Sequence, residues 1–479
     1  MVKKAGAAAS LDAGILQRHA QPIDERRAAG KALRERCPRG AHAGWKGKGK
    51  GQGQGKGQRA DPIDLLIASS KGRIESLLPL RHARMAVSPF TFYRGAAAVM
   101  AADLARTPDA GIAVQVCGDC HLLNFGGFAT PERHLVFDIN DFDETAVAPW
   151  EWDIKRLAAS FVIAGRDLGF GGDNCREAAW HAVRAYREHM AHIAETPVLE
   201  AWYAVTELSE FIAGAEDKEY QRLSERALKK ATARSAHDAE FAKLAYVQGE
   251  RPLIKDDPPL IYHELPTGDA QAYRRDFDFA YRGYLASLPP ARRLLLERYS
   301  VADVAVKVVG VGSVGTACGI VLLMSGGGDP LFLQYKEARR SVLEPYAGRS
   351  PYANRGERVV VGQQIMQSAS DIFLGWTRVR EGRHYYLRQL RDAKIKPTLA
   401  LMRPLNLRNY AKICGRVLAR AHSRSGDAAM LSGYLGSSSA FEDAMLPFAT
   451  GYADQNERDH DALIKAIRGG RIEAAPLEH

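Results

Sequence analysis

Helical periodicity dominates the first 300 residues of the chain, gives way to strand patterns over 301–395, and then returns. Within the middle stretch, residues 301–310, 316–324 and 330–338 are rich in β-branched side chains and are separated by glycine-rich turns. A doubly wound sheet needs strands that alternate with helices along the chain, which this order does not provide. The sequence therefore predicts an α+β fold in which a small antiparallel sheet lobe interrupts a mostly helical lobe.

Two further short strands are predicted inside the first helical part. Residues 112–117 end at Gly118, and residues 135–140 end in the acidic run Asp141–Glu144. Helices are expected over 93–107, 151–168, 176–196, most of 199–250, 269–299, 355–370 and 405–424, with a hairpin around residues 381 and 382.

The positive charge of the chain is confined to its first 60 residues. They hold 14 Lys and Arg against four Asp and Glu, which accounts for the whole net charge of +10. Glycine and charged residues alternate over 44–59, so we expect 1–60 to be a disordered basic tail that offers at most weak contact to a nucleic acid or another anionic partner. The neutral remainder argues against a nucleic-acid-binding body.

Targeting signals are weak in this sequence. No apolar stretch approaches the roughly 20 residues that a membrane-spanning helix needs. The start, with Lys3 and Lys4 before an Ala-rich run broken by Asp12, is a poor export signal. The six cysteines are sparse for 479 residues. We expect a cytoplasmic protein with no membrane partner and no disulfide framework.

The glycine-rich segment 310–315 reads Gly-Val-Gly-Ser-Val-Gly and lies between two predicted strands. Such glycines either open a helix under a pyrophosphate or form a hairpin turn that covers the phosphates of ATP in a kinase. The strand-like residues that follow favour the kinase type of hairpin, with an ordinary glycine-rich hairpin as the alternative. Lys336, on the next strand, stands where a kinase places the lysine that holds the α- and β-phosphates. The predicted nucleotide ligands are Gly310, Gly312, Ser313, Gly315 and Lys336.

The segment Gly118–Asn124 has the composition of a catalytic loop. Phosphoryl transfer needs a carboxylate that orients the acceptor hydroxyl, and an amide oxygen with a second carboxylate on magnesium. Asp119 and Asn124 have the spacing of a kinase catalytic loop, and the second carboxylate should end the next strand. We predict Asp119 and His121 as catalytic residues. The predicted metal ligands are Asn124 with Asp141, and Asp143 and Asp138 are the alternatives to Asp141.

This loop resembles that of aminoglycoside phosphotransferases and related small-molecule kinases. They carry Gly-Asp-x-His-x-x-Asn, then a strand ending in Asp, then Asp-Leu-Ala at the start of a helix; the last element would here be Asp153–Ala158. In a conventional kinase the glycine loop precedes the catalytic loop, whereas here it follows. A circular permutation reconciles the two orders. Tyr410–His422 then resembles the helix that normally precedes the catalytic loop.

Three positions leave alternatives open. A kinase lysine usually pairs with a glutamate on the following helix; Glu357 and Glu344 are both available and neither has compelling spacing, with Glu357 taken as the candidate. Arg94 is expected to form a structural ion pair, with binding of an anionic group as the alternative. Residues 117–121 match the C-x-x-C-H pattern of haem attachment, and the two cysteines would also suit a redox pair or half a zinc site. We interpret them as small residues flanking the loop.

The body also resembles the bacterial domain-of-unknown-function family 2252 over roughly residues 65–460. The matching stretches are Ser88–Gly95, Gly118–Gly126, Asn140–Glu144, Gly310–Thr316, Gln334–Ala338 and Ser370–Gly375. That family is grouped with protein-kinase-like folds, so the resemblance implies a fold and no particular substrate. The predicted segments are the tail 1–60, a helical lobe with the catalytic loop and metal site over 61–300, a sheet-rich nucleotide lobe over 301–395, and helices completing the large lobe over 396–479.

Together these patterns predict a circularly permuted, two-lobed, protein-kinase-like phosphotransferase. It would use ATP and Mg²⁺ and act on an unknown small-molecule or protein hydroxyl. One alternative keeps the fold but transfers a nucleotidyl group, or merely binds nucleotide. A second alternative is a non-enzymatic basic protein that binds nucleic acid.

Overall fold

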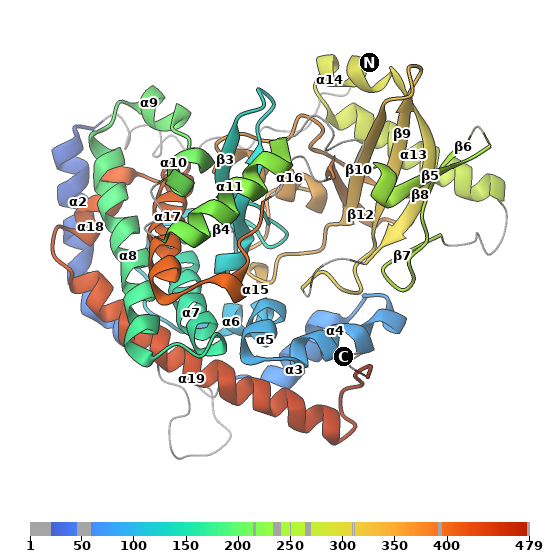
Figure 1. Ribbon diagram of the computed structural model, residues 1–479. Coiled ribbons are helices and arrows are strands. Elements are labelled where there is room, and N and C mark those ends of the chain that lie inside the picture. Colours follow the sequence, from blue (N-terminus) through green and yellow to red (C-terminus); the bar gives the residue numbers. More distant parts are fainter. Residues whose placement is uncertain are drawn as a thin grey trace, which may run out of the picture.

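A computed structural model describes residues 21–45, 59–213, 217–232, 241–249, 251–263, 270–308, 310, 312–390 and 395–476. A larger helical lobe and a smaller sheet lobe lie next to each other in Figure 1, with short hairpins at their junction. The coarse prediction of an α+β fold with small antiparallel sheets is confirmed. Among the described helices, none is long and apolar enough to span a bilayer.

The helical lobe is built around two long helices, α8 (Gly172–Glu195) and α17 (Pro404–Ser423), which pack against each other. The helix α7 (Glu151–Asp167) packs on α8, and α19 (Ala440–Arg468) packs on both. The remaining helices of this lobe are α2 (Ile23–Arg36), α3 (Pro62–Ser70), α4 (Leu78–Ala86), α5 (Pro89–Gly95), α6 (Ala97–Leu104), α9 (Val198–Tyr203), α10 (Leu208–Ala213), α11 (Lys218–Thr232) and α18 (Ala428–Leu435), with 3-10 turns at 39–43, 75–77, 122–124 and 399–401.

Two antiparallel strand pairs carry the loops of the site. The strands β1 (Ala113–Val116) and β4 (Ala146–Pro149) pair with each other, as do β2 (Phe125–Ala129) and β3 (Leu135–Ile139). β1 therefore leads into the predicted catalytic loop, and β3 leads into the acidic run, as the sequence predicts.

The sheet lobe contains a six-stranded antiparallel sheet in the order β11-β12-β10-β9-β8-β7. Alternate side chains of β9 point to opposite faces: Val321 and Leu323 pack against helices α13 and α14, and Ile320 and Leu322 pack against the β5–β6 hairpin. The elements of this lobe are β5 (Ala245–Gln248), β6 (Arg251–Ile254), β7 (Ile261–Tyr262), α13 (Ala270–Ser287), α14 (Pro290–Leu296), β8 (Tyr299–Lys307), β9 (Cys318–Ser325), β10 (Pro330–Glu337), α15 (Glu344–Ala347), α16 (Arg355–Met366), β11 (Gly375–Arg378) and β12 (His384–Gln389).

The structure corrects two predicted boundaries. The described residues between 245 and 296 belong with the sheet lobe, because α13 packs on β11 and the Thr377 hydroxyl donates to the Ala280 carbonyl. The prediction of helix through most of 199–250 is wrong at β5. Within the predicted disordered tail 1–60, the helix α2 packs on α18, and Arg34 donates to the carbonyls of Tyr434 and Gly433. The basic composition of this segment did not indicate that Arg34 is bonded, because its partners lie about 400 residues away in the sequence.

The contact between α8 and α17 depends on a glycine. A Cβ added at Gly415 would lie 2.1 Å from the main-chain oxygen of Ala182, so Gly415→Ala must push the two helices apart. We expect this variant to lose about 3 kcal/mol of unfolding free energy in chemical denaturation. The matched control is Gly451→Ala in α19, where the nearest atom is 3.5 Å away and no loss is expected. Equal stability of the two variants would contradict this packing.

Candidate functional site

A cavity of about 490 Å³ lies where the predicted catalytic loop (Gly118–Asn124), the acidic run and the glycine-rich hairpin meet. Its lining runs from Ser69 to Pro397, so only the fold brings these segments together. The predicted site residues that line it are Asp119, His121, Asn124, Asp141, Asp143, Gly310, Gly312 and Ser313. Of the remaining predictions, Lys336 is bonded to a lining residue, and Gly315 and Glu357 lie outside the lining.

The catalytic loop is held by the start of α7. Asp153 accepts hydrogen bonds from the main-chain N–H groups of Cys117, at 2.7 Å, and Gly118, at 3.0 Å. Gly118 has φ +81°, and a Cβ there would lie 2.3 Å from the Glu144 carbonyl oxygen, so the position requires glycine. His422, at the end of α17, lies 3.3 Å from Asp153 through Nε2. The helix-opening aspartate predicted from the kinase resemblance therefore positions the loop.

Asp119 has one oxygen engaged and the other available. Its Oδ1 accepts from Nε of the buried Arg156 at 2.7 Å, and Arg156 forms a second bond to it through Nη2. Its Oδ2 lies 3.9 Å from Nε2 of His121, and none of the described residues donates a hydrogen bond to it. Burial raises the pKa of Asp119, while the neighbouring Arg156 opposes the rise. The free oxygen can thus accept a hydrogen bond or a proton from a ligand.

His121 and Asn124 complete the loop. Burial, together with the charges of Arg156 and Arg94, lowers the pKa of His121 well below its ordinary value, so its imidazole is neutral. The Asn124 amide nitrogen donates to the Asp119 carbonyl at 2.6 Å. Among the described residues, none donates a hydrogen bond to Asn124 Oδ1, which lines the cavity and could coordinate a hard cation.

The two carboxylates of the acidic run differ in their partners. Asp143 accepts from Lys336 Nζ at 2.5 Å and from the Tyr386 hydroxyl at 2.7 Å, and Ser313 Oγ lies 3.3 Å away. Burial alone would lower the pKa of Lys336, but the charges of Asp141 and Asp143 hold it well above its ordinary value. Asp141 accepts only the Asp143 main-chain N–H, at 3.2 Å, among the residues that the structure describes. Asp141 therefore has more free oxygen lone pairs.

The expected pairing of Lys336 with Glu357 is not found, because Asp143 is the partner of Lys336. Glu357 lies in the first turn of α16 and is half-buried outside the cavity. The next residue, Arg358, is buried and donates to the carbonyls of Thr145 and Asp143. The buried face of α16 thus carries the guanidinium of Arg358 and not the carboxylate of Glu357. Asp138, an alternative metal ligand, is fully buried against Arg420 and lies away from the cavity lining.

The glycine-rich hairpin connects β8 and β9, as predicted, and it is tied to the helical lobe. Arg73 donates from Nη1 to the carbonyls of Gly312 and Val314 at 2.8 and 2.6 Å. Arg84 donates to the Gly310 carbonyl at 2.7 Å. Sequence reasoning missed Arg73, Arg84, Arg156, Arg358 and Tyr386, because no local pattern marks a side chain whose partner is distant in the chain.

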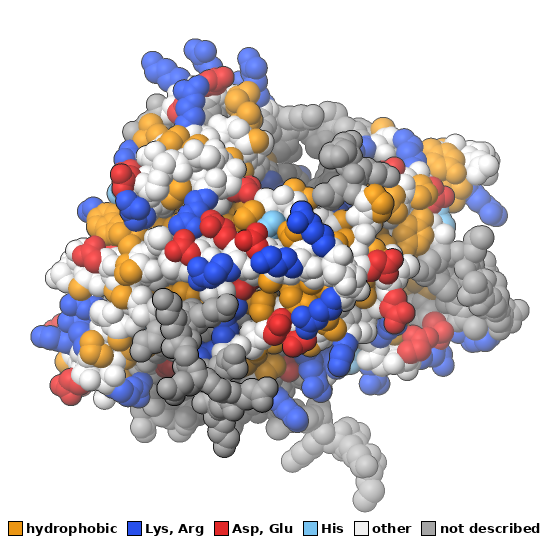
Figure 2. All heavy atoms as spheres, turned by 90° about the horizontal axis from the view of Figure 1, so that it is seen from below, with side chains coloured by type: hydrophobic (Ala, Val, Ile, Leu, Met, Phe, Trp, Pro, Cys, Tyr) orange, Lys and Arg blue, Asp and Glu red, His pale blue; other side chains and the backbone are white. Residues whose placement is uncertain are grey.

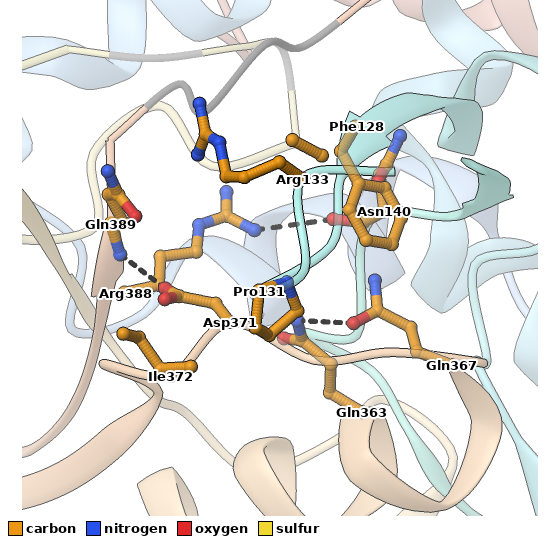
Figure 3. Close-up of a pocket in the computed structure, with 11 residues that line it drawn as sticks. Phe128, Pro131, Arg133, Asn140, Gln363, Gln367, Asp371, Ile372, Arg388 and Gln389 are labelled. Atoms are coloured by element: carbon orange, nitrogen blue, oxygen red, sulfur yellow. Dashed lines mark hydrogen bonds between the residues drawn. The ribbon is translucent and has the colours of Figure 1, made fainter. Parts of the chain in front are cut away.

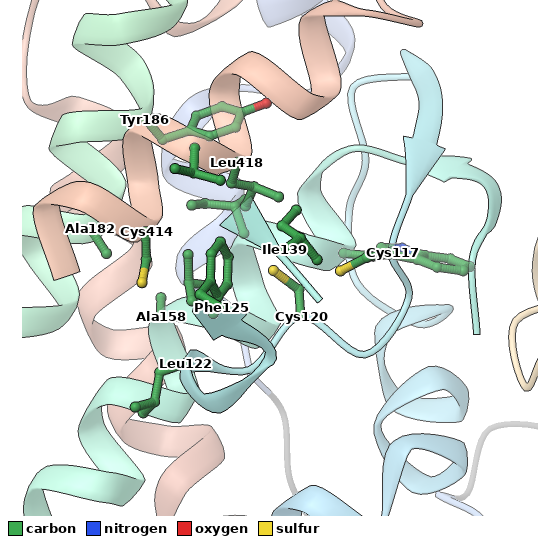
Figure 4. Packing of buried hydrophobic residues seen from close by; sticks show 14 of the residues in the cluster. Cys117, Cys120, Leu122, Phe125, Ile139, Ala158, Ala182, Tyr186, Cys414 and Leu418 are labelled. Atoms are coloured by element: carbon green, nitrogen blue, oxygen red, sulfur yellow. The ribbon is translucent and has the colours of Figure 1, made fainter. Parts of the chain in front are cut away.

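The C-x-x-C pair is part of the hydrophobic core. Cys117 and Cys120 are fully buried beside Phe125 and Ile139 (Figure 4), and all six cysteines are free. Cys117, Cys120 and Asp153 offer ligand atoms within 4.8 Å of one another. However, burial raises the pKa of both thiols, and Asp153 is already bonded to the loop, so the group fits core packing better than a metal or haem site.

A second cavity of about 270 Å³ lies between the β2–β3 turn, the end of α16 and β12. Figure 3 shows its polar lining, in which Gln363 donates to Gln367 and Arg388 reaches the Asn140 carbonyl at 3.3 Å. Asp371, from the family-like stretch 370–375, accepts the Gln389 main-chain N–H. None of the predicted site residues lines this cavity.

The geometry defines a two-lobed α+β protein with an inter-lobe cavity that gathers carboxylates, an amide and a glycine-rich hairpin. The chain belongs to the family described as an uncharacterized protein conserved in bacteria (DUF2252), which matches residues 73–466. No curated protein and no solved structure matches the chain. The matched residues include the sheet lobe, most of the helical lobe after α3, and every predicted site residue.

Proposed function

We propose that this protein is an ATP- and Mg²⁺-dependent phosphotransferase with a circularly permuted kinase-like fold, acting on a hydroxyl group. The observation that carries the proposal is the meeting, in one cavity, of the glycine hairpin, the Asp119–Asn124 loop and the Asp141–Asp143 run, with Lys336 bonded to Asp143. Each was predicted from its own local sequence pattern, and these patterns do not by themselves require the segments to meet in one cavity.

The strand order supports the permutation. The glycine hairpin joins the first two of the strands β8, β9 and β10, and β10 carries Lys336. The helix α16 follows and packs on β11 and β12, as the helix after the lysine strand does in a kinase. The chain then returns to α17, whose Tyr410 hydroxyl donates to the Leu122 carbonyl of the catalytic loop at 2.7 Å. Helix α17 is thus in contact with a loop that comes almost 290 residues earlier.

The donor set fits the proposed ligands. Asn124 Oδ1 and the Asp141 carboxylate are the hard oxygen ligands that magnesium prefers, and bound magnesium would neutralise charge on the phosphates. Lys336 would exchange its bond to Asp143 for one to a phosphate. Asp119 would orient the acceptor through Oδ2, while Arg156 keeps the carboxylate in place.

The proposed transfer forms one bond and breaks one. The acceptor oxygen bonds to the γ-phosphorus as the bond from that phosphorus to the β–γ bridging oxygen breaks, and ADP leaves. The hydroxyl proton passes to Asp119. Most of the acceleration would come from positioning and charge neutralisation.

The non-enzymatic alternative gains little support. Figure 2 shows one face of the molecule, on which Lys and Arg side chains lie among Asp and Glu side chains, whereas nucleic acid binding favours a stripe of basic residues. Arg26, within the predicted tail, pairs with Asp427 at 2.9 Å. The cytoplasm, which supplies ATP and magnesium, remains the proposed location.

Labelled ATP distinguishes phosphoryl from nucleotidyl transfer. The protein is incubated with Mg²⁺ and ATP labelled at either the α- or the γ-phosphorus, with water or added hydroxyl compounds as acceptors. We expect ADP as the nucleotide product, with only the γ-label moved. Movement of the α-label would establish the nucleotidyl alternative.

A further inference from the structure

One wall of the cleft presents arginines that have no carboxylate partner. Arg81 is buried and donates to the Ser70 hydroxyl at 3.2 Å and to the Gly95 carbonyl at 2.9 Å. Arg73 donates only to main-chain carbonyls. Neither forms an ion pair with a described carboxylate. The Nε atoms of Arg81 and Arg94 are both buried and have no hydrogen-bond partner.

Arg94 is the least satisfied of these cations. The structure gives it no hydrogen bond or ion pair to any described residue, so the structural ion pair expected from the sequence is absent. Lys396 lines the same cavity, also without a hydrogen bond to the described residues. Both lie close enough to the catalytic loop to lower the pKa of His121. Burial lowers the pKa of both Arg94 and Lys396, as expected for cations that lack a counterion.

Among the described residues, no carboxylate forms an ion pair with Arg94 or Lys396, and Asp141 acts on Lys396 through its charge alone. Asp119 is bonded to Arg156, and Asp143 is bonded to Lys336. A partly buried cation without a partner costs free energy, which a ligand that brings its own negative charge recovers. A guanidinium suits a phosphate or a carboxylate in particular, because its planar fork can donate two parallel hydrogen bonds.

The position of Arg94 in the cavity suggests where a bound anion would lie, namely on the side of Asp119, where the acceptor is expected. Arg94 lies on α5, which packs on α7, and the preceding Tyr93 accepts from Arg156 Nη2 at 3.0 Å through its carbonyl. Arg156 in turn holds Asp119. Arg94 is therefore fixed to the same framework as Asp119, whereas Lys336 reaches the cavity from the sheet lobe.

We propose that the acceptor is an anionic hydroxyl compound, and that Arg94, assisted by Lys396, binds its phosphate or carboxylate group while Asp119 orients its hydroxyl. The proposal rests on the proposed function for the role of Asp119. The same unpaired guanidinium could instead contact the γ-phosphate of the nucleotide, so the test separates these two sources of phosphate.

The probe is inorganic phosphate, titrated calorimetrically into the full-length protein saturated with Mg²⁺ and a non-hydrolysable ATP analogue. With the γ-position filled, phosphate should still bind. Arg94→Gln should weaken that binding about tenfold or more, and Arg94→Lys should restore part of it. Affinity for the ATP analogue should stay within about twofold. The matched control is Arg340→Gln, an exposed arginine of the same cavity, which should leave phosphate binding unchanged.

Each outcome decides one of the two claims. Phosphate binding that vanishes once the analogue is bound, or Arg94→Gln that weakens the analogue and leaves phosphate unaffected, assigns Arg94 to the nucleotide and overturns the proposal. Equal losses in Arg94→Gln and Arg340→Gln also overturn it. If wild type binds no nucleotide but binds phosphate through Arg94, the anion site stands and the phosphotransferase proposal fails.

Discussion

Asp119→Asn is expected to slow phosphoryl transfer about 1,000-fold while MgATP affinity stays within about twofold. The reason is that Asp119 Oδ2 is the free carboxylate oxygen of the loop, and an amide in its place does not take up the proton of the acceptor hydroxyl. Transfer is measured as ADP release under saturating MgATP.

Asparagine is the informative substitution because Arg156 is buried against this side chain. Alanine would leave the buried guanidinium without its carboxylate partner and cost several kcal/mol of stability, so a loss of activity could reflect unfolding and not chemistry. An asparagine oxygen can still accept from Arg156. A folded Asp119→Asn protein that transfers phosphate at the wild-type rate would remove Asp119 from the mechanism.

Asp141→Asn should weaken ATP binding in the presence of Mg²⁺ by about 100-fold or more. The reason is that losing a residue bound directly to the metal weakens metal binding more than losing one that only supports a metal ligand. Asp141 is chosen over Asp143 because Lys336 and Tyr386 already occupy the oxygens of Asp143. Binding is measured by titration of ATP at saturating magnesium.

The magnesium-free titration is the internal control for this variant. Without the metal, wild type and Asp141→Asn should bind ATP equally weakly. A variant that keeps the full magnesium dependence would show that Asp141 is not the ligand, and the same experiment on Asp143→Asn would then decide between the two carboxylates.

The local elements were predictable because they rest on short-range patterns. Alternating β-branched residues predicted β8, β9 and β10, and the glycines between the first two predicted their hairpin. Likewise, the spacing from Asp119 to Asn124 predicted a loop that the fold places beside Asp141.

The errors share one physical origin. Whether Lys336 pairs with Glu357 or Asp143 depends on how α16 is rotated against the sheet, and helical periodicity does not specify that rotation. The partners Arg156 and Arg73 come from segments that reach the site only through tertiary packing. Similarly, α2 looked like part of a basic tail because the surface of α18 that covers it is encoded near the other end of the chain.

The central claim is that the glycine hairpin, Lys336 and the catalytic loop form one nucleotide site. Calorimetric titration of ATP into the wild-type protein, with and without Mg²⁺ and beside Lys336→Met, tests this most directly. The account predicts saturable binding of one ATP per chain that requires magnesium and is lost in a folded Lys336→Met protein. Absence of ATP binding by folded wild-type protein at saturating magnesium, or binding that is unchanged in Lys336→Met, would contradict it.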